Sequence, residues 1–148
     1  MKNNLLFIIY CTWYLIFCIG SSSDNFEENI AKGQCYVRDA AQQGANIILL
    51  QELFQGLYFC QEQDPKHFDK ADEYGVENNV LRHFIPLAKE LGVVLPISYY
   101  ERSNNSFFNS LAVIGADGEL LGNYRKSHIP DGNGYQEKFY FSPGDTGF

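Results

Sequence analysis

Residues 46–51 read Asn-Ile-Ile-Leu-Leu-Gln, a short apolar run that is followed at once by Glu52. The run is too short for a typical helix, and it shows no alternation of apolar and polar residues. Such a pattern is typical of a strand whose two faces are both covered, as in a layered α/β sheet. It predicts an α/β domain and places the Glu52 carboxylate at the carboxyl end of a central strand, where such sheets bind ligands.

The segment before this run predicts an amphipathic helix over residues 25–43. Asp24 and Glu27 have the spacing of a capping box at its start, and Gly44 suits the position just past a helix end. Its apolar or small residues recur at helical spacing: Phe26, Ile30, Gly33, Val37, Ala40 and Ala41.

The segment after the run begins with a long loop over residues 54–75, and loops of that length in a compact domain are usually functional. A second helix is expected over residues 80–91, ended by Gly92 and either kinked or weakened by Pro86. Strands are expected at residues 93–100, 107–115 and 119–124, the last two joined by a turn at residues 116–118. The resulting order, helix, strand, helix and three strands, favours a layered α/β domain.

The composition excludes several classes of function. The formal net charge is −7 and the basic residues do not cluster, which argues against nucleic-acid binding. The four cysteines, Cys11, Cys18, Cys35 and Cys60, form no CxxC pair and no metal-type cluster with histidine. Residues 132–134, Gly-Asn-Gly, lack the Lys-Ser/Thr that would follow in a phosphate-binding loop. We therefore expect neither a metal nor a cofactor.

The chain begins with an apolar leader. Residues 5–20, LLFIIYCTWYLIFCIG, follow Lys2 and precede three serines, as in a secretory signal peptide. A signal or anchor would make residues 104–106, Asn-Asn-Ser, a glycosylation acceptor. A buried first strand with ragged flanks, or an N-terminus foreign to the rest, would explain the run equally. We divide the chain into a leader at 1–23 and a domain at 24–148.

Glu52 and Lys126 share one property, since each follows a predicted strand. A partly desolvated carboxylate can accept a proton from a nucleophile, and a nearby lysine can stabilise an oxyanion. The alternative is that both side chains pair with solvent or with one another. Glu137 by itself is typical of a solvated surface carboxylate in a turn-rich loop.

A site built on a carboxylate and a lysine needs a nucleophile. Cys35 falls within the first predicted helix, where we expect it to contribute to packing. Cys60, in the long loop, is the better candidate, although a packed loop thiol explains it more simply. His128 is expected to make a local hydrogen bond.

Three stretches resemble the nitrilase-type carbon–nitrogen hydrolases: ANIILLQELFQGLYFC, LAKELGVVLPISYYE and NSLAVIGADGELLGNYRKSHIPDGNGYQEKFYFSPGDTGF. The resemblance covers residues 24–148. It implies the N-terminal half of a four-layer α-β-β-α sandwich, a small-molecule N-carbamoyl amine or amide substrate, no cofactor, homo-oligomers of the full-length relatives and a cytoplasmic location. The leader, as a signal or anchor through residues 5–20, would instead direct the chain to the secretory pathway or membrane.

The same resemblance assigns roles to residues. Glu52 matches the general base, Lys126 the lysine that stabilises the oxyanion, and Glu137 a supporting glutamate. It places the nucleophilic cysteine downstream of residue 148, and Cys60 does not occupy its position. We therefore expect the 148-residue chain to be inactive by itself. A second hypothesis is a non-catalytic fragment that associates with full-length amidase oligomers and modulates them.

Overall fold

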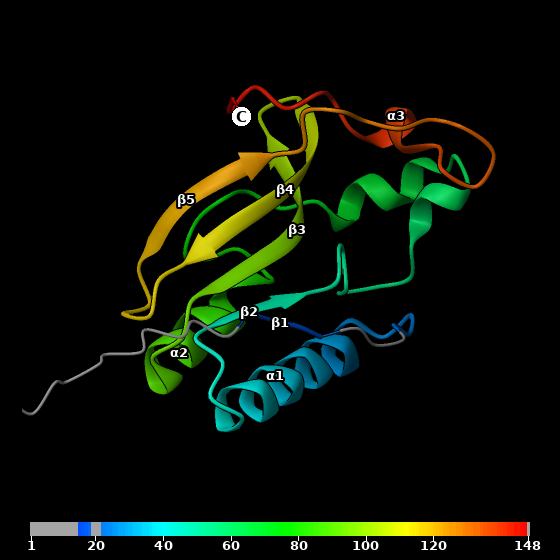
Figure 1. Ribbon diagram of the computed structural model, residues 1–148. Helices are drawn as coiled ribbons and strands as arrows, with labels where there is room; N and C mark the ends of the chain where they lie inside the picture. Colours follow the sequence, from blue (N-terminus) through cyan, green and yellow to red (C-terminus); the bar gives the residue numbers. More distant parts are fainter. Residues whose placement is uncertain (1–14, 19–21, 148) are drawn as a thin grey trace, which may run out of the picture.

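The computed structural model describes residues 15–18 and 22–147, and its strands form two connected sheets (Figure 1). Strand β1 (Leu15–Cys18) pairs in parallel with β2 (Ile47–Leu50). Strands β3 (Leu95–Ser103), β4 (Ser106–Ile114) and β5 (Leu120–Arg125) form an antiparallel sheet in the order β3-β4-β5. A parallel bridge between Ile47 and Val94 connects the two sheets.

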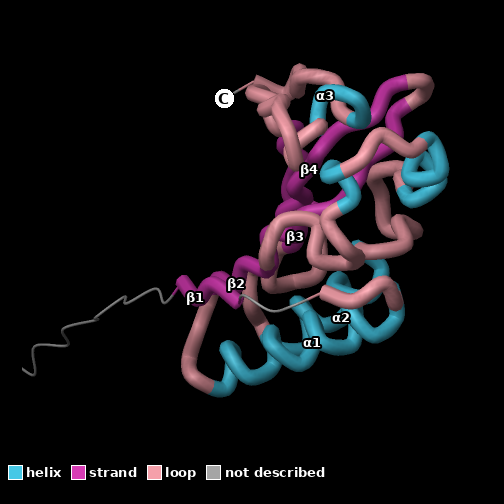
Figure 2. The backbone as a smooth tube through the Cα atoms, turned by 90° about the vertical axis from the view of Figure 1, so that its right-hand side faces the viewer, coloured by secondary structure: helices cyan, strands magenta, loops and turns pink. Residues whose placement is uncertain are grey.

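Helices α1 (Phe26–Gln42) and α2 (Leu81–Leu91) lie on the same side of the strands, as Figure 2 shows. The main core lies between these helices and the sheets, because both helices turn their apolar stripes toward the strands. Fully or almost fully buried members include Val37, Ile48, Leu81, Phe84, Leu95, Ile97 and Ile114. The predicted α/β class and the predicted helices and strands are thus confirmed.

The start of α1 differs from the expectation. Asn25, not Asp24, is the N-cap, and its Oδ1 accepts a hydrogen bond from the Glu28 N–H at 3.1 Å. The predicted capping box of Asp24 and Glu27 is therefore wrong by one residue, because the side chain that meets a free N–H belongs to Asn25. Gly44 does adopt a left-handed conformation after the helix, with φ of 90°.

The predicted order of elements lacked β1. This strand falls inside the apolar leader, for which a first strand was one of the three expectations. Residues 1–14 and 19–21 lie outside the described residues, so the reading as a signal or anchor stays a prediction. In the described part of the chain, no helix is long and apolar enough to cross a membrane.

The two faces of β2 differ in burial. Ile48 and Leu50 are buried under the helices, whereas Ile47 and Leu49 are only half-buried. The expectation that both faces are covered therefore holds for one face among the described residues.

Helix α2 runs without a break through Pro86, which lies exposed, and ends at Gly92 with φ of 65°. Pro86 therefore does not end the helix, and the expected kink or loss of stability stays a prediction.

The long loop after β2 encloses a second, smaller core. It contains short 3-10 helices at Phe59–Gln61 and Pro65–Lys70, and it packs against the end of β3 and helix α3 (Glu137–Tyr140). The buried residues of this cluster come from distant parts of the chain: Leu53, Phe59, Cys60, Ala71, Tyr100, Ile129, Tyr140 and Phe141. The aromatic contacts of Phe59 with Tyr100 and of Phe68 with Phe107 hold the loop against β3 and the start of β4.

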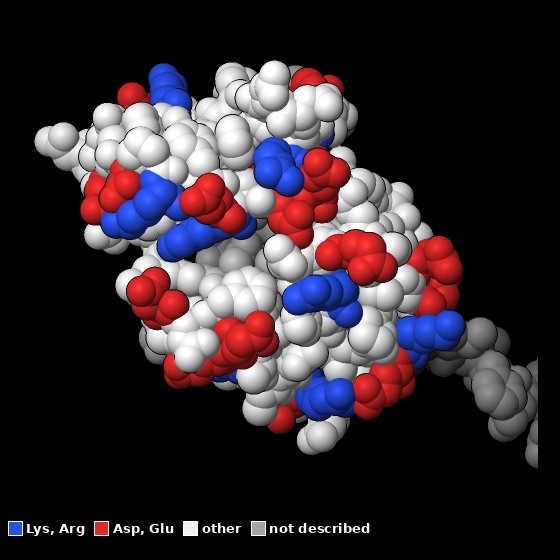
Figure 3. All heavy atoms as spheres, turned by 180° about the vertical axis from the view of Figure 1, so that it is seen from behind, with Lys and Arg blue, Asp and Glu red and all other residues white. Residues whose placement is uncertain are grey.

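The surface carries mixed charge. On the face shown in Figure 3, Lys and Arg side chains lie beside Asp and Glu side chains. The exposed pair of Arg38 and Glu90, with Nη1 and Oε1 2.5 Å apart, links α1 to α2 in this manner.

Candidate active site

The three charged residues singled out in the sequence meet at one edge of the sheets. Lys126 directly follows β5, Glu52 follows β2 by two residues, and Glu137 begins α3. The Lys126 ammonium nitrogen lies 2.8 Å from Glu137 Oε2 and 3.2 Å from Glu52 Oε1. One cation therefore holds two carboxylates that come from distant parts of the sequence.

Glu52 is positioned by the turn that follows it. Leu53 adopts φ of 50°, a left-handed conformation that costs a residue with a β-carbon roughly 1–2 kcal/mol. Its N–H donates to Ser98 Oγ at 3.1 Å, which holds the turn. Asn109, from β4, donates its side-chain amide to Glu52 Oε1. The carboxylate itself is half exposed, with 51% of its side-chain surface accessible.

Glu137 is buried, with only 5% of its side-chain surface accessible. Its two oxygens are both satisfied, because Oε2 accepts from Lys126 and Oε1 accepts from the Tyr58 hydroxyl at 2.7 Å. The prediction that Glu137 by itself is a solvated surface group is therefore wrong. Tyr58 lies 79 positions away in the sequence and Lys126 lies 11 positions away, so only the resemblance of the segment YQEKFYF gave a signal for the place of Glu137 in the site.

Lys126 is fixed through its backbone on both sides. Its N–H donates to the Asn109 carbonyl at 2.9 Å, and its own carbonyl accepts the Gly144 N–H at 2.9 Å. Burial acts to lower the pKa of the Lys126 ammonium, but the hydrogen bond to Glu137 and the charge of Glu52 outweigh it and raise that pKa. The ammonium is consequently charged at neutral pH.

Asn109 and Tyr58 are residues that the sequence reasoning missed. Each contacts one of the two carboxylates, and Asn109 contacts Lys126 as well. No spacing rule identifies an asparagine in the middle of a strand or a tyrosine in a loop as part of such a site.

The two described cysteine side chains are poorly suited as nucleophiles here. Cys60 is fully buried, and this burial, together with the charge of Glu137, raises the pKa of its thiol to about 12. At neutral pH it is a neutral packing group. Cys35 lies on the exposed side of α1, so the expectation that it contributes to packing is wrong. In the described residues, no group of three or more His, Cys, Asp or Glu side chains is arranged to hold a metal ion.

A recess of about 240 Å³ opens beside Glu52 and Lys126. Its wall is mostly apolar and comes from β2, β4 and β5, with Leu49, Leu111 and Tyr124 among the contributors. The recess offers a cation and a carboxylate at one end of an apolar surface. This combination can bind a carbonyl compound with its oxygen toward Lys126 and its proton donors toward Glu52.

The sequence and the fold match one family. The carbon–nitrogen hydrolase family model matches residues 18–148, and the chain belongs to this family. A solved carbon–nitrogen hydrolase from Helicobacter pylori G27 superimposes with a TM-score of 0.84 at 35% identity, covering 92% of this chain and 46% of that one. The expected nitrilase-type fold is confirmed.

Two curated relatives are closely similar to this chain in sequence. N-carbamoylputrescine amidase from Solanum tuberosum is 57% identical over 126 residues, which is 85% of this chain and 42% of the relative. Citrullinase from Francisella tularensis subsp. tularensis is 49% identical over 128 residues, 86% of this chain and 44% of the relative. The chain thus spans less than half the length of these relatives.

Proposed function

We propose that this chain provides the carboxylate and lysine part of the active site of an amidase that hydrolyses N-carbamoylputrescine to putrescine, carbon dioxide and ammonia. The single observation that carries the proposal is the shared Lys126 ammonium, 3.2 Å from Glu52 and 2.8 Å from Glu137. The 57% identity to the Solanum tuberosum relative supports the substrate. The nucleophilic thiol would come from sequence that the family resemblance places after residue 148.

The first half of the reaction would use Glu52 as the base. A ureido carbonyl is stabilised by resonance, so attack requires a thiolate and a cation facing the carbonyl oxygen. Glu52, half exposed at the mouth of the recess, accepts the thiol proton as sulfur bonds to carbon. Lys126 stabilises the oxyanion. The carbon–nitrogen bond then breaks, and the proton on Glu52 passes to the leaving ammonia.

The second half would release the acyl group. Glu52, again a carboxylate, takes a proton from water, and the resulting hydroxide attacks the carbonyl carbon of the thiol adduct. The carbon–sulfur bond breaks, and the thiolate recovers the proton. The carbamic acid that leaves decomposes to carbon dioxide and putrescine.

Glu137 would serve to position Lys126. Its hydrogen bond with Tyr58 leaves Oε2 directed at the ammonium, and its burial keeps it away from water. A lysine held by two carboxylates stays charged and keeps its place when the carbonyl arrives, so little reorganisation is needed in the transition state.

Ammonia release from N-carbamoylputrescine tests the proposal. The 148-residue chain is assayed alone and after co-expression with the downstream segment of the Solanum tuberosum relative. We expect background release from the chain alone and clear release from the pair. Citrulline, the ureido compound named by the Francisella relative, serves as the competing substrate.

A matched pair of variants assigns the activity to this chain. Glu52→Gln should reduce ammonia release to background, whereas Glu119→Gln, the same change on an exposed residue of the β4–β5 turn, should leave it unaltered. Full activity of the Glu52→Gln chain, co-expressed with the downstream segment, would refute the assignment of Glu52 as the base. Faster ammonia release from citrulline than from N-carbamoylputrescine would refute N-carbamoylputrescine as the preferred substrate and leave the proposed mechanism unchanged.

A further inference from the structure

The turn that carries Glu52, residues 51–55, contains a strained residue. Leu53 has a left-handed φ of 50°, which is uncommon for a residue with a β-carbon. Strain of this kind persists only where the surroundings fix it, and it is frequent at functional sites. The contacts around the turn therefore decide where the Glu52 carboxylate lies.

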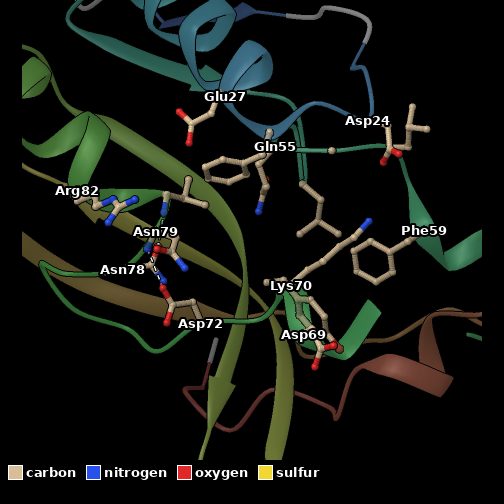
Figure 4. Close-up of a pocket in the computed structure, with 16 residues that line it drawn as sticks. Asp24, Glu27, Gln55, Phe59, Asp69, Lys70, Asp72, Asn78, Asn79 and Arg82 are labelled. Atoms are coloured by element: carbon tan, nitrogen blue, oxygen red, sulfur yellow. Dashed lines mark hydrogen bonds between the residues drawn. The ribbon is translucent and has the colours of Figure 1, made fainter. Parts of the chain in front are cut away.

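Open space borders one side of this turn. A pocket of about 360 Å³ lies between the turn and the start of α1, and Leu53, Gln55 and Glu27 are among the residues that line it (Figure 4). Side-chain packing is incomplete on this side, so it does less here than in the core to keep the strained backbone in place. Hydrogen bonds are needed to fix the turn at this point.

The segment that leads into α1 supplies such hydrogen bonds. Ser22 Oγ donates to the Phe54 carbonyl at 2.9 Å and accepts from Gln51 Nε2, also at 2.9 Å. Gln51 directly precedes Glu52, and Phe54 follows it by two residues. A single hydroxyl, 29 positions before Gln51 in the sequence, therefore spans the turn around Glu52.

Asn29 strengthens the same attachment. It is 3% exposed, and its side-chain amide donates to the Gln55 carbonyl at 3.2 Å and to the Ser23 carbonyl at 2.7 Å. Its Oδ1 accepts the Ser23 N–H at 2.9 Å. Asn29 thus connects the residue next to Ser22 to the end of the turn, which keeps the Ser22 hydroxyl within reach of Phe54.

We propose that Ser22 and Asn29 are positioning residues for Glu52, because they fix the turn that presents its carboxylate to Lys126. The inference rests on the proposed function, in which Glu52 is the base. On the side of the sheet, Ser98 accepts a backbone N–H of the same turn at 3.1 Å. The turn is therefore held between β3 and the segment before α1.

Loss of the Ser22 hydroxyl should move the Glu52 carboxylate. The Phe54 carbonyl would lose its donor, and Leu53 could relax toward a backbone conformation that costs less. In the intact turn Glu52 Oε1 lies 3.2 Å from Lys126 Nζ. We expect this distance to increase when the turn relaxes.

Three variants test the effect on turnover. Ser22→Ala is compared with Ser22→Thr, which keeps a hydroxyl, and with Ser103→Ala, the same change in a half-buried serine at the end of β3. Each chain is co-expressed with the downstream segment of the Solanum tuberosum relative and assayed for ammonia release from N-carbamoylputrescine. Ser22→Ala should be roughly twofold to tenfold slower, the range of one neutral hydrogen bond, and the other two should match wild type. Equal losses in Ser22→Ala and Ser22→Thr, or no loss in Ser22→Ala, would overturn the proposal.

The pKa of Lys126 gives a second readout, on the 148-residue chain alone. Burial acts to lower this pKa, whereas the hydrogen bond to Glu137 and the charge of Glu52 act to raise it. A displaced Glu52 should therefore lower the Lys126 pKa in Ser22→Ala, measured by NMR titration of chain with isotope-labelled lysine. The pKa should not change in Ser103→Ala.

This readout separates positioning from a purely structural role. If Ser22 only stabilised the fold, Ser22→Ala would unfold at a lower urea concentration and keep the wild-type pKa of Lys126. That result would overturn the proposal. If the wild-type chain releases no ammonia with the downstream segment, the proposed function fails, and a lowered Lys126 pKa in Ser22→Ala would still show that Ser22 positions Glu52.

Discussion

Asn109 donates its side-chain amide to Glu52 Oε1. The same residue accepts the N–H of Lys126 on its backbone carbonyl at 2.9 Å, so one position of β4 holds both the carboxylate and the lysine. Asn109 is 5% exposed, and its place in the sheet is fixed by pairing with Tyr100 on β3. The geometry of the candidate site thus depends on a residue that takes no part in the proposed chemistry.

Asn109→Ala should slow ammonia release while the chain stays folded. The backbone contact to Lys126 remains, but Glu52 loses the donor that orients it. A loss of about 1–3 kcal/mol in this interaction corresponds to a rate reduction of roughly fivefold to 150-fold. The assay is ammonia release by the chain co-expressed with the downstream segment of the relative. Asn105→Ala, in the exposed β3–β4 turn, is the control, and equal rates for the two variants would contradict the assignment.

Tyr58→Phe should destabilise the chain. The hydroxyl satisfies Oε1 of the buried Glu137, and its loss leaves a carboxylate oxygen without a donor. The expected cost is about 1–3 kcal/mol in the free energy of unfolding by urea. Tyr135→Phe removes a hydroxyl from a residue that is 62% exposed and should cost little. If the two variants unfold at the same urea concentration, water replaces the tyrosine at Glu137.

Gly144→Ala should disturb Lys126 more than any other glycine substitution near the site. A β-carbon at position 144 would lie 2.0 Å from the Arg125 carbonyl oxygen, so the backbone next to Lys126 must move. We expect a loss of at least about 2 kcal/mol in the free energy of unfolding. Gly132→Ala is the control, because its β-carbon would have no atom within 4 Å. An equally stable Gly144→Ala variant would show that Lys126 is held by its side chain alone.

Alkylation should distinguish the two described thiols. Cys35 is exposed, whereas Cys60 is buried and the pKa of its thiol is raised to about 12. Iodoacetamide at pH 8 should therefore modify Cys35 in the native chain and leave Cys60 intact, with peptide mass spectrometry as the readout. In urea both should react. Rapid modification of Cys60 in the native chain would mean that the smaller core around it opens readily, and Cys60 would again be a candidate nucleophile.

The helices and strands could be predicted from the sequence more completely than the contacts of the candidate site. The strand at 46–51 and the turn at 116–118 were predictable because apolar pattern and turn residues act locally. The cap of α1 was not, because Asp24 and Asn25 are both good caps and spacing does not choose between them. Glu137 was unpredictable from its neighbours, since its burial depends on Tyr58 and Lys126. The left-handed turn at Leu53 was not predictable either, because the Ser98 hydroxyl that accepts its N–H lies 45 positions away in the sequence.

The last prediction concerns acid stability and rests on Glu101. This carboxylate is 1% exposed and forms a paired hydrogen bond with Arg125, whose Nη2 lies 2.5 Å from Oε1 and whose Nε lies 3.1 Å from Oε2. Ser110 and Asn123 also donate to Oε2. Burial acts to raise the pKa of Glu101, but the hydrogen bonds from Arg125, Ser110 and Asn123 outweigh it and lower that pKa.

A lowered folded-state pKa contributes stability that is present above the unfolded pKa of about 4.3 and is lost as the pH falls through the folded value. The free energy of unfolding should therefore fall between pH 5 and pH 3. Four other carboxylates also have pKa values lowered by their basic partners and contribute in the same direction: Glu62, Asp64, Glu90 and Asp145.

Comparison with Glu101→Gln isolates the contribution of the buried pair of Glu101 and Arg125. The variant should be about 3 kcal/mol less stable at pH 7 and should lose less stability on acidification. Urea unfolding at pH 7, 5 and 3 measures both quantities, with Glu119→Gln as the exposed control. An identical loss of stability on acidification in wild type and Glu101→Gln would show that folding does not lower the pKa of Glu101 or that other carboxylates govern acid unfolding.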